Sequence, residues 1–484
     1  MADHSTESLN DLTYFTVGTY HVYHCPTLAT YCKQDELNQK HVVLFGYASK
    51  PEKWEFTETE LLDQLLKLES IDHIARYISR IVGRYSIFIL INGDGYVFHD
   101  PAGLRTVYYI ISPGITVFGT QPLILSEFCK LEAGYKVELF FHSNYFKNAD
   151  EYWLPAGLSV YENVQQLVPN HYLRLITKKE VRYWPFEPLK KLSFDDTVDY
   201  LSRYLSDSVL NASKKIDLVL PLTSGLDSRI LLASSKKCID NIICYTRIHK
   251  KNINKYHQDI AIPSKILKSF GHKHNIIIAD CSVTPTVEER YKLNNSTSRF
   301  QDSVTLFSSS TEIIRNKYVM YGNVSELIKI RKSDNNYLSL HDFDIIPNGW
   351  FEIGFVNLHL EKWYDTAVNI YEEFGLHPYE LFYWEHRLGN WAARAYNEND
   401  LAFDVYTPFN SRDILSTAMM LDISQRELPE GKLHRAVINQ LWPEIDKYPY
   451  NKRNIVGVMK AMIRKTGKIT MIDRLIFGLN EVLN

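Results

Sequence analysis

The chain has 484 residues, of which 45% are hydrophobic, so it can bury large cores and its length favours two or more domains. A formal net charge of −3 gives no long-range attraction to nucleic acid or to an acidic membrane surface. The six cysteines form no CxxC pair and no Cys/His ligand spacing, which argues against a zinc site or a disulfide framework. No stretch is apolar enough for a membrane span. We expect a soluble protein of the reducing cytoplasm, with no nucleic-acid or membrane partner.

The first part of the chain, from Tyr14 to about Arg182, is rich in predicted strands. The segments HVVLFGYA, GRYSIFILIN, GYVFHD, TVYYIIS and ITVFGT are separated by turn signals such as NGDG and SPG. A leucine-rich helical stretch, Leu61 to Leu68, precedes a second periodic stretch, Ile71 to Ile81. We predict a layered β-rich domain in which Asp100, Gly103 and Arg105 are turn residues that hold the fold.

A domain boundary is predicted at WPFEPLKKLSFDD, which separates residues 1–185 from residues 190–484. Ser193 is expected to cap a new helix whose apolar stripe is Val198, Leu201, Leu205 and Val209. The strands NIICYT, NIIIAD and YVMYG then alternate with helical stretches, among them 259–270 and 303–315. This alternation predicts an α/β fold with a doubly wound parallel sheet. The rest, from about Gly349, is predicted to be mainly helical.

The most informative stretch is IDLVLPLTSGLDSRILLASSKK, which reads as a strand from Ile216 to Leu222, a tight loop, and a helix from Arg229 to Ser235. Such a loop exposes amides at a helix N-terminus, which favours a phosphate. Asp227 would repel a bare anion, so it indicates a divalent cation between the carboxylate and the phosphates. The loop therefore predicts magnesium–ATP. The alternative is an ordinary strand-to-helix turn with a polar cap.

The loop LTSGLDS resembles the SGGxDS pyrophosphate loop of N-type ATP pyrophosphatases, with Thr223 and Ser224 departing from that pattern. GRYSIFILIN, HDPAGLRTVYY and FGTQ resemble the glutaminase-type domain of asparagine synthetases, and YGNVSEL resembles their SGxGxDE segment. The family's relatives include β-lactam synthetases and lasso-peptide cyclases. The resemblance implies an Ntn-type αββα-like layered domain, degenerate as a glutaminase. It also implies a second domain with an adenine nucleotide alpha hydrolase-like parallel sheet and helical additions.

Three segments are expected to meet at the C-terminal ends of the parallel strands, where ligands of such sheets bind. By resemblance, Asp227 and Glu326 would hold Mg²⁺, Asp259 would brace the site, and Lys452, in PYNKRNIVG, would offset charge on the phosphates. Lys432 stands behind Lys452 as a weaker candidate, and for both lysines a solvated charge is the alternative. The expected nucleotide-binding residues are Leu220, Thr223, Ser224, Gly225, Leu226, Asp227, Ser228, Tyr245, Thr246 and Gly322.

Two departures from the family bear on catalysis. Ala2 stands where the family has its glutaminase cysteine, so no acyl-enzyme can form there. Asn323 stands where relatives carry Glu or Tyr, and asparagine cannot take a proton at neutral pH. We therefore choose Glu385, in FYWEHRLGNW, as the candidate base, with a pKa raised by burial among aromatics. The alternative is a structural ion pair, with Arg387 or on a helix surface.

The resulting hypothesis is an AMP-forming carbon–nitrogen ligase of the asparagine biosynthesis type that uses ATP and Mg²⁺. Its substrate would be a small-molecule or peptide carboxylate, attacked by ammonia or an amine. Two alternatives are a nucleotide-binding pseudoenzyme or scaffold of the same family and a tRNA-modifying pyrophosphatase, which the charge disfavours. A homodimer is compatible with the sequence. The final ITMIDRLIFGLNEVLN is predicted to be a docked helix rather than a membrane-binding one.

Overall fold

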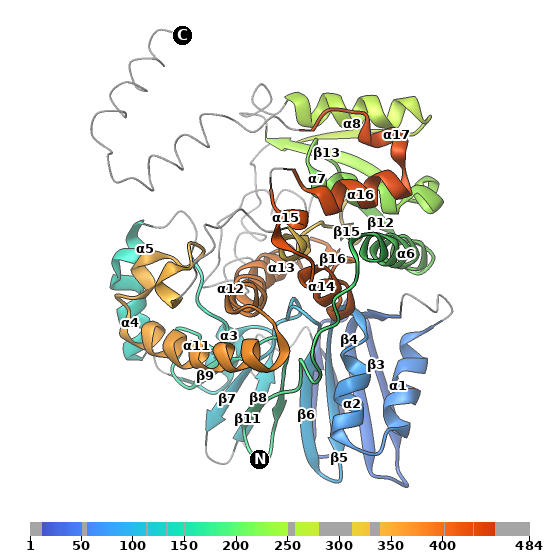
Figure 1. Ribbon diagram of the computed structural model, residues 1–484. Coiled ribbons are helices and arrows are strands. Elements are labelled where there is room, and N and C mark those ends of the chain that lie inside the picture. The colour runs from blue at the N-terminus through green and yellow to red at the C-terminus, as the bar shows by residue number, and fades with distance from the viewer. Residues whose placement is uncertain are drawn as a thin grey trace, which may run out of the picture.

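The computed structural model describes residues 12–50, 56–112, 115–131, 134–148, 152–249, 257–279, 312–329, 339–400, 402–428 and 430–450. Within them the protein is a mixed α/β fold with one all-parallel five-stranded sheet and antiparallel sheets. Figure 1 shows the antiparallel strands at one end, the parallel sheet at the other, and helices α12 to α14 between them. One continuous hydrophobic core runs from Val42 to Ile445 and joins the two ends.

A six-stranded antiparallel sheet, in the order β11-β10-β6-β5-β4-β3, forms the larger part of the N-terminal half. Side chains alternate across it, so that Val42 and Leu44 enter one core and Val43 enters the other. Helix α1 packs on this sheet and begins with a capping box between Thr57 and Glu60. The bounds are β3 Thr30–Asp35, β4 Lys40–Ser49, β5 Val82–Ile91, β6 Asp94–His99, β10 His171–Arg174, β11 Lys179–Arg182, α1 Glu58–Lys67 and α2 Ile71–Ile78.

Two smaller antiparallel sheets complete this half, one of two strands and one of three in the order β8-β7-β9. Helix α4 lies beside α11 (Gly354–Phe374) from the other half (Figure 1), where the Lys136 ammonium lies over the Phe355 ring. The five strands that the sequence predicts in the N-terminal half are all present, as β4 to β8. The bounds are β1 Thr13–Val17, β2 Tyr20–His24, β7 Tyr108–Ser112, β8 Ile115–Gly119, β9 Val164–Gln166, α3 Pro122–Phe128, α4 Tyr135–His142 and α5 Asn144–Asn148.

The parallel sheet has the order β14-β13-β12-β15-β16, with β12 at its centre. Four of its strands were predicted: β12 Leu218–Pro221, β13 Ile243–His249, β14 Asn275–Ala279 and β15 Tyr318–Met320. The fifth, β16 (Asp404–Tyr406), was not, because three residues are too few to show a period in a helix-rich region. β16 pairs in parallel with β15, which makes β15 an interior strand.

Helices cover the parallel sheet, and three of them, α6, α7 and α16, pack on one another. Ser193 caps α6, accepting a hydrogen bond from the amide of Asp196, as predicted. The bounds are α6 Phe194–Ser213, α7 Leu226–Ser234, η2 Lys236–Asn241, α8 His257–Ser269, η4 Ser325–Ile328, η5 Leu340–Asp342, η6 Asn348–Trp350, α12 Pro378–Phe382, η7 Tyr383–Ala392, α13 Ala393–Asn399, α14 Arg412–Met419, α15 Ile423–Arg426, α16 Lys432–Leu441 and α17 Pro443–Asp446.

A partly buried ionic network, in which two buried arginines meet two half-buried aspartates, joins the two halves. Arg84, on β5, pairs with Asp400 and lies 2.8 Å from Asp404. Arg105 adds a 2.8 Å contact to Asp404, and its amide donates to Asp100, which is fully buried. Asp100 therefore holds the turn, as the sequence predicts, and Arg105 also crosses to the second half.

No helix among the described residues is long and apolar enough to cross a membrane. Two predicted helices, the stretch 303–315 for the most part and the terminal ITMIDRLIFGLNEVLN, lie outside the described residues.

Candidate functional site

The loop between β12 and α7 has the predicted strand–loop–helix form, but the helix begins earlier than predicted. α7 starts at Leu226 rather than Arg229, so Asp227 and Ser228 lie in its first turn. A carboxylate is favoured there by the helix dipole. Gly225 is the N-cap residue, and as a glycine it has no side chain that could cap the helix. The first amides of α7 thus have no intrahelical acceptor and are suited to bind an anion.

Hydrogen bonds inside the loop hold its shape. Ser228 Oγ accepts from the Thr223 amide at 3.1 Å and donates to the Thr223 carbonyl at 3.0 Å. Ser224 donates to Asp259 through both its amide, at 2.9 Å, and its hydroxyl, at 2.6 Å. The Gly225 amide donates to Thr223 Oγ1 at 3.2 Å. In this structure the amides of Ser224 and Gly225 are engaged within the loop, whereas the first amides of α7, from Leu226 onward, have no intrahelical acceptor.

Asp227 is held by residues that follow β15. Its Oδ1 accepts a hydrogen bond from Ser325 Oγ at 2.8 Å and contacts the ammonium of Lys329. Burial would raise the pKa of Asp227, but the charge and hydrogen bond of Lys329, with smaller contributions from His434 and the Ser325 hydrogen bond, outweigh it and lower that pKa. Within the described part of the chain, Oδ2 has no hydrogen bond or ion pair. Asp227 is therefore an ionised carboxylate with one oxygen paired.

Glu326 lies on η4, near enough to Asp227 for the two charges to interact. A Cβ added at Gly322 would lie 2.7 Å from the Asp227 Cβ, so the loop after β15 packs directly on Asp227. Burial, with a contribution from the negative charge of Asp227, raises the pKa of Glu326. Its Oε1 accepts from Asn323 Nδ2 at 3.4 Å, while Oε2 is buried without a partner among the described residues.

Two further polar side chains that the sequence did not indicate lie close to Asp227, and one of them, Lys329, contacts it. Lys329 follows Glu326 by three residues, and this spacing is the one sequence signal that could have placed Lys329 near the site. His434, on α16, is 1% exposed, and its Nε2 lies 3.8 Å from Asp227 Oδ1, beyond hydrogen-bond distance. Burial lowers the pKa of His434 to about 4, so the imidazole is neutral at pH 7. Neither of its ring nitrogens has a partner among the described residues.

The remaining predicted nucleotide-binding residues, Leu220, Tyr245 and Thr246, lie on β12 and β13 rather than in the loop. Pro221, at the end of β12, lies opposite Tyr245, whose carbonyl accepts from the Leu222 amide at 2.7 Å. Thr246 Oγ1 donates to the Leu222 carbonyl at 2.7 Å, which ties β13 to the start of the loop. The side chain of Leu220 is fully buried inside β12 and packs in the core, and that of Tyr245 is only 1% exposed.

Lys452 lies outside the described residues. The described segment that precedes Lys452 is held against α7 by Arg229. The Arg229 guanidinium donates to the Tyr448 carbonyl at 2.7 Å and to the Pro449 carbonyl at 2.8 Å. It also lies 3.8 Å from the centre of the Tyr450 ring. Lys432 is exposed at the first position of α16.

Glu385 is not placed as a base. Its carboxylate is fully buried and receives hydrogen bonds from Arg182 at 2.6 and 2.9 Å, Asn170 at 3.1 Å and Trp363 at 2.8 Å. The prediction that burial raises its pKa is wrong, because desolvation is outweighed by the Arg182 pair and the pKa is lowered to about 2. The partner is Arg182 rather than Arg387, whose guanidinium lies over the Trp391 ring.

The Asp227–Glu326 pair suits a magnesium ion that arrives with phosphates. Mg²⁺ is bound through one or two carboxylates plus substrate oxygens and retains waters. The unpaired Oε2 of Glu326 is an oxygen that such an ion would satisfy. Among the described residues no group of three or more His, Cys, Asp or Glu side chains could hold a metal by itself.

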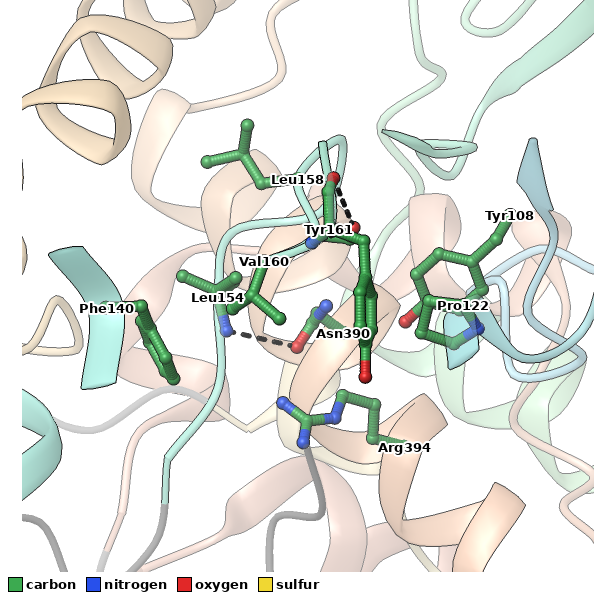
Figure 2. Close-up of a pocket in the computed structure, with 10 residues that line it drawn as sticks. Tyr108, Pro122, Phe140, Leu154, Leu158, Val160, Tyr161, Asn390 and Arg394 are labelled. Carbon is green, nitrogen blue, oxygen red and sulfur yellow. Dashed lines mark hydrogen bonds between the residues drawn. The ribbon is translucent and has the colours of Figure 1, made fainter. Parts of the chain in front are cut away.

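Figure 2 shows a separate pocket where the N-terminal half meets η7 and α13. Asn390 and Arg394 lie among apolar side chains there, and the Leu154 amide donates to Asn390 Oδ1 at 3.3 Å. The free volume is about 10 Å³, room for roughly one water molecule. It is too small for a nucleotide or an acid substrate.

No protein-family model matches the chain, and no curated protein matches it.

Proposed function

We propose that the protein is an ATP-dependent, amide-bond-forming ligase of the asparagine synthetase type. The observation that carries this proposal is one juxtaposition: the uncapped N-terminus of α7, with Asp227 in its first turn, faces Gly322 and Glu326 across neighbouring parallel strands. Open α/β sheets bind ligands at the carboxyl ends of their strands. Helix amides bind phosphate, and paired carboxylates bind Mg²⁺.

The proposal includes the finer architecture. Residues 1–185 would be a degenerate Ntn-type αββα-like glutaminase domain, and residues 190–484 an adenine nucleotide alpha hydrolase-like synthetase domain. The antiparallel sheets of the first half and the five-stranded parallel sheet of the second support this division. The partly buried Arg84–Asp404 contact and the shared core support a bracing role for the first domain.

In the proposed reaction, an oxygen of a small-molecule or peptide carboxylate attacks the α-phosphorus of ATP and pyrophosphate leaves. Ammonia or an amine then displaces AMP from the acyl-adenylate. The first amides of α7 would bind the leaving pyrophosphate oxygens, which stabilises the charge that develops on them. Asp227 and Glu326 would hold Mg²⁺, which supplies further positive charge at the phosphates. Lys452 stays a candidate for the same task.

We also propose that the chain has no glutaminase activity of its own. Ala2 lies outside the described residues. Desolvation raises the pKa of the thiols of four of the five described cysteines, Cys32, Cys129, Cys238 and Cys244, in the last case to about 12, while the fifth, Cys25, is exposed. A thiol with a raised pKa is a weak nucleophile. The nitrogen would come from free ammonia, a separate protein or an amine substrate.

The test is product analysis. The purified protein is incubated with ATP, Mg²⁺, ammonium and pools of amino and dicarboxylic acids, and the nucleotides are separated by chromatography. AMP with pyrophosphate is the expected product pair, and Asp227→Asn abolishes it. Asp217→Asn is the matched control, because Asp217 is exposed just before the other end of β12, paired with Lys317. ADP with phosphate as the products would refute the assignment.

A nucleotide-binding pseudoenzyme is the second candidate. It is favoured by Asn323, which cannot act as a base and whose carbonyl accepts from Thr407 Oγ1 at 2.9 Å. Under this alternative the protein binds Mg–ATP, and Asp227→Asn weakens that binding, but no pool of acids yields AMP.

A further inference from the structure

Lys329 is placed as a counter-ion inside the candidate site. It follows directly on η4, and its side chain is 11% exposed. Its ammonium contacts Asp227 Oδ1, the same oxygen that accepts the Ser325 hydrogen bond. The lysine lies outside the YGNVSEL segment, so the resemblance assigns it no role.

The surroundings of this ion pair contain polar groups that the pair does not satisfy. His434 is 1% exposed and has no hydrogen-bond partner for either ring nitrogen among the described residues, although Nε2 lies 3.8 Å from Asp227 Oδ1. Glu326 Oε2 is also buried without a partner in the described chain. Buried polar groups in folded proteins are usually paired. Two such groups beside one carboxylate therefore indicate a site that is completed by a ligand.

The charges decide which ligand can enter first. A free divalent cation that approaches Asp227 meets the positive charge of Lys329, which already neutralises that carboxylate. A polyphosphate meets the same ammonium and the first amides of α7, both of which attract it. The lysine stem is flexible, so its ammonium can turn from Asp227 to a phosphate oxygen. Asp227 is then released to bind a cation that the phosphates carry.

We propose that Lys329 is the counter-ion of Asp227 in the nucleotide-free protein. Its ammonium excludes free divalent cations from the site, so that Mg²⁺ enters only together with nucleotide phosphates. This inference rests on the proposed function for the identity of the nucleotide. It adds a specificity-determining residue and an order of binding to the site. The exclusion of free cations depends only on the contacts around Asp227.

The test measures the binding of Mn²⁺, as a probe for Mg²⁺, by the full chain without nucleotide, using the electron paramagnetic resonance signal of free Mn²⁺. Lys329→Met removes the charge and keeps a similar volume, and we expect it to tighten Mn²⁺ binding at least tenfold. The double variant Lys329→Met/Asp227→Asn returns to weak binding. Lys317→Met is the matched control, because Lys317 pairs with Asp217 at 2.5 Å near the other ends of β15 and β12. It leaves Mn²⁺ binding unchanged.

A parallel titration measures Mg–ATP by calorimetry, and we expect Lys329→Met to weaken it about tenfold. Mn²⁺ binding by Lys329→Met that is no tighter than in the parent overturns the inference. If the Mn²⁺ result holds but no variant binds ATP, the exclusion stands and the proposed function fails. If AMP forms but Mn²⁺ binding is unchanged, the function stands and the inference fails. Lys329→Gln, which retains a hydrogen-bond donor, replaces the Met variant if that protein does not fold.

Discussion

Replacing Glu385 by Gln separates a structural carboxylate from a catalytic one. Gln keeps the shape of the side chain and removes its charge, so the Arg182 guanidinium faces a neutral partner and loses one of its two hydrogen bonds, because an amide nitrogen cannot accept one. The pKa of Glu385 falls from 4.5 to about 2 in the folded protein. At about 1.4 kcal/mol per pKa unit, this corresponds to about 3 kcal/mol of stability. Breaking one partner of a buried ion pair costs about 3–5 kcal/mol, in the same range.

The assay is equilibrium unfolding in urea at pH 7, followed by tryptophan fluorescence. We expect Glu385→Gln to lower the free energy of unfolding by about 3 kcal/mol. Glu373→Gln is the matched control, because Glu373 is exposed near the end of α11, and it should change stability by less than about 0.5 kcal/mol. Both variants, where folded, bind Mg–ATP like the parent, since Glu385 contacts Arg182, Asn170 and Trp363 and not the α7 loop.

The pH dependence has a defined sign. The pKa of Glu385 is lowered in the folded state. The ionised side chain therefore makes its full contribution to the free energy of unfolding above its unfolded-state pKa of 4.5, and this contribution is lost as the pH falls through about 2. The difference between the parent and Glu385→Gln should therefore narrow as the pH is lowered from 5 toward 2. A difference below about 1 kcal/mol at pH 7 would refute the structural role. A fully stable variant with selectively slow amide formation would restore Glu385 as the base.

Three further predictions concern the site and its loop. Asp227→Ala should lower the rate of AMP formation at least a hundredfold, measured by chromatography at saturating ATP, because it removes the proposed magnesium ligand. Incubation with glutamine should release no glutamate in a coupled dehydrogenase assay, and glutamate release that is lost on alkylation of the thiols would contradict this. Val324 is fully buried at φ 79°, a conformation that strains a β-branched residue. Val324→Gly should therefore destabilise the protein by roughly 1 kcal/mol in urea unfolding, against about 3 kcal/mol for Val319→Gly in β15, and equal losses would rule out the strain.

Local signals in the sequence predicted β4 to β8 and β12 to β15, together with α1, α2 and α6, but not β1 to β3, β9 to β11 or β16. The apolar runs HVVLFGYA and GRYSIFILIN, with the turn signals between the predicted strands, indicated β4 and β5, and the stripe after Ser193 indicated α6. The turn residues between β12 and α7 marked the loop that carries Asp227. These features depend on residues close to one another in the chain, so their periodicity and caps can be recognised in the amino-acid sequence. The start of α7 was misplaced by three residues because Asp227 and Ser228 suit both a loop and a first helical turn.

Only the tertiary structure decided the electrostatics of the site. Arg182 and Glu385 are 203 positions apart, and Lys329 and Asp227 are 102 apart. A pKa depends on burial and on charges within a few ångströms, which the fold brings together. The aromatic residues around Glu385 in the sequence therefore indicated a raised pKa, while the distant arginine lowered it. The fold likewise places His434 close to Asp227, because α16 packs on α7.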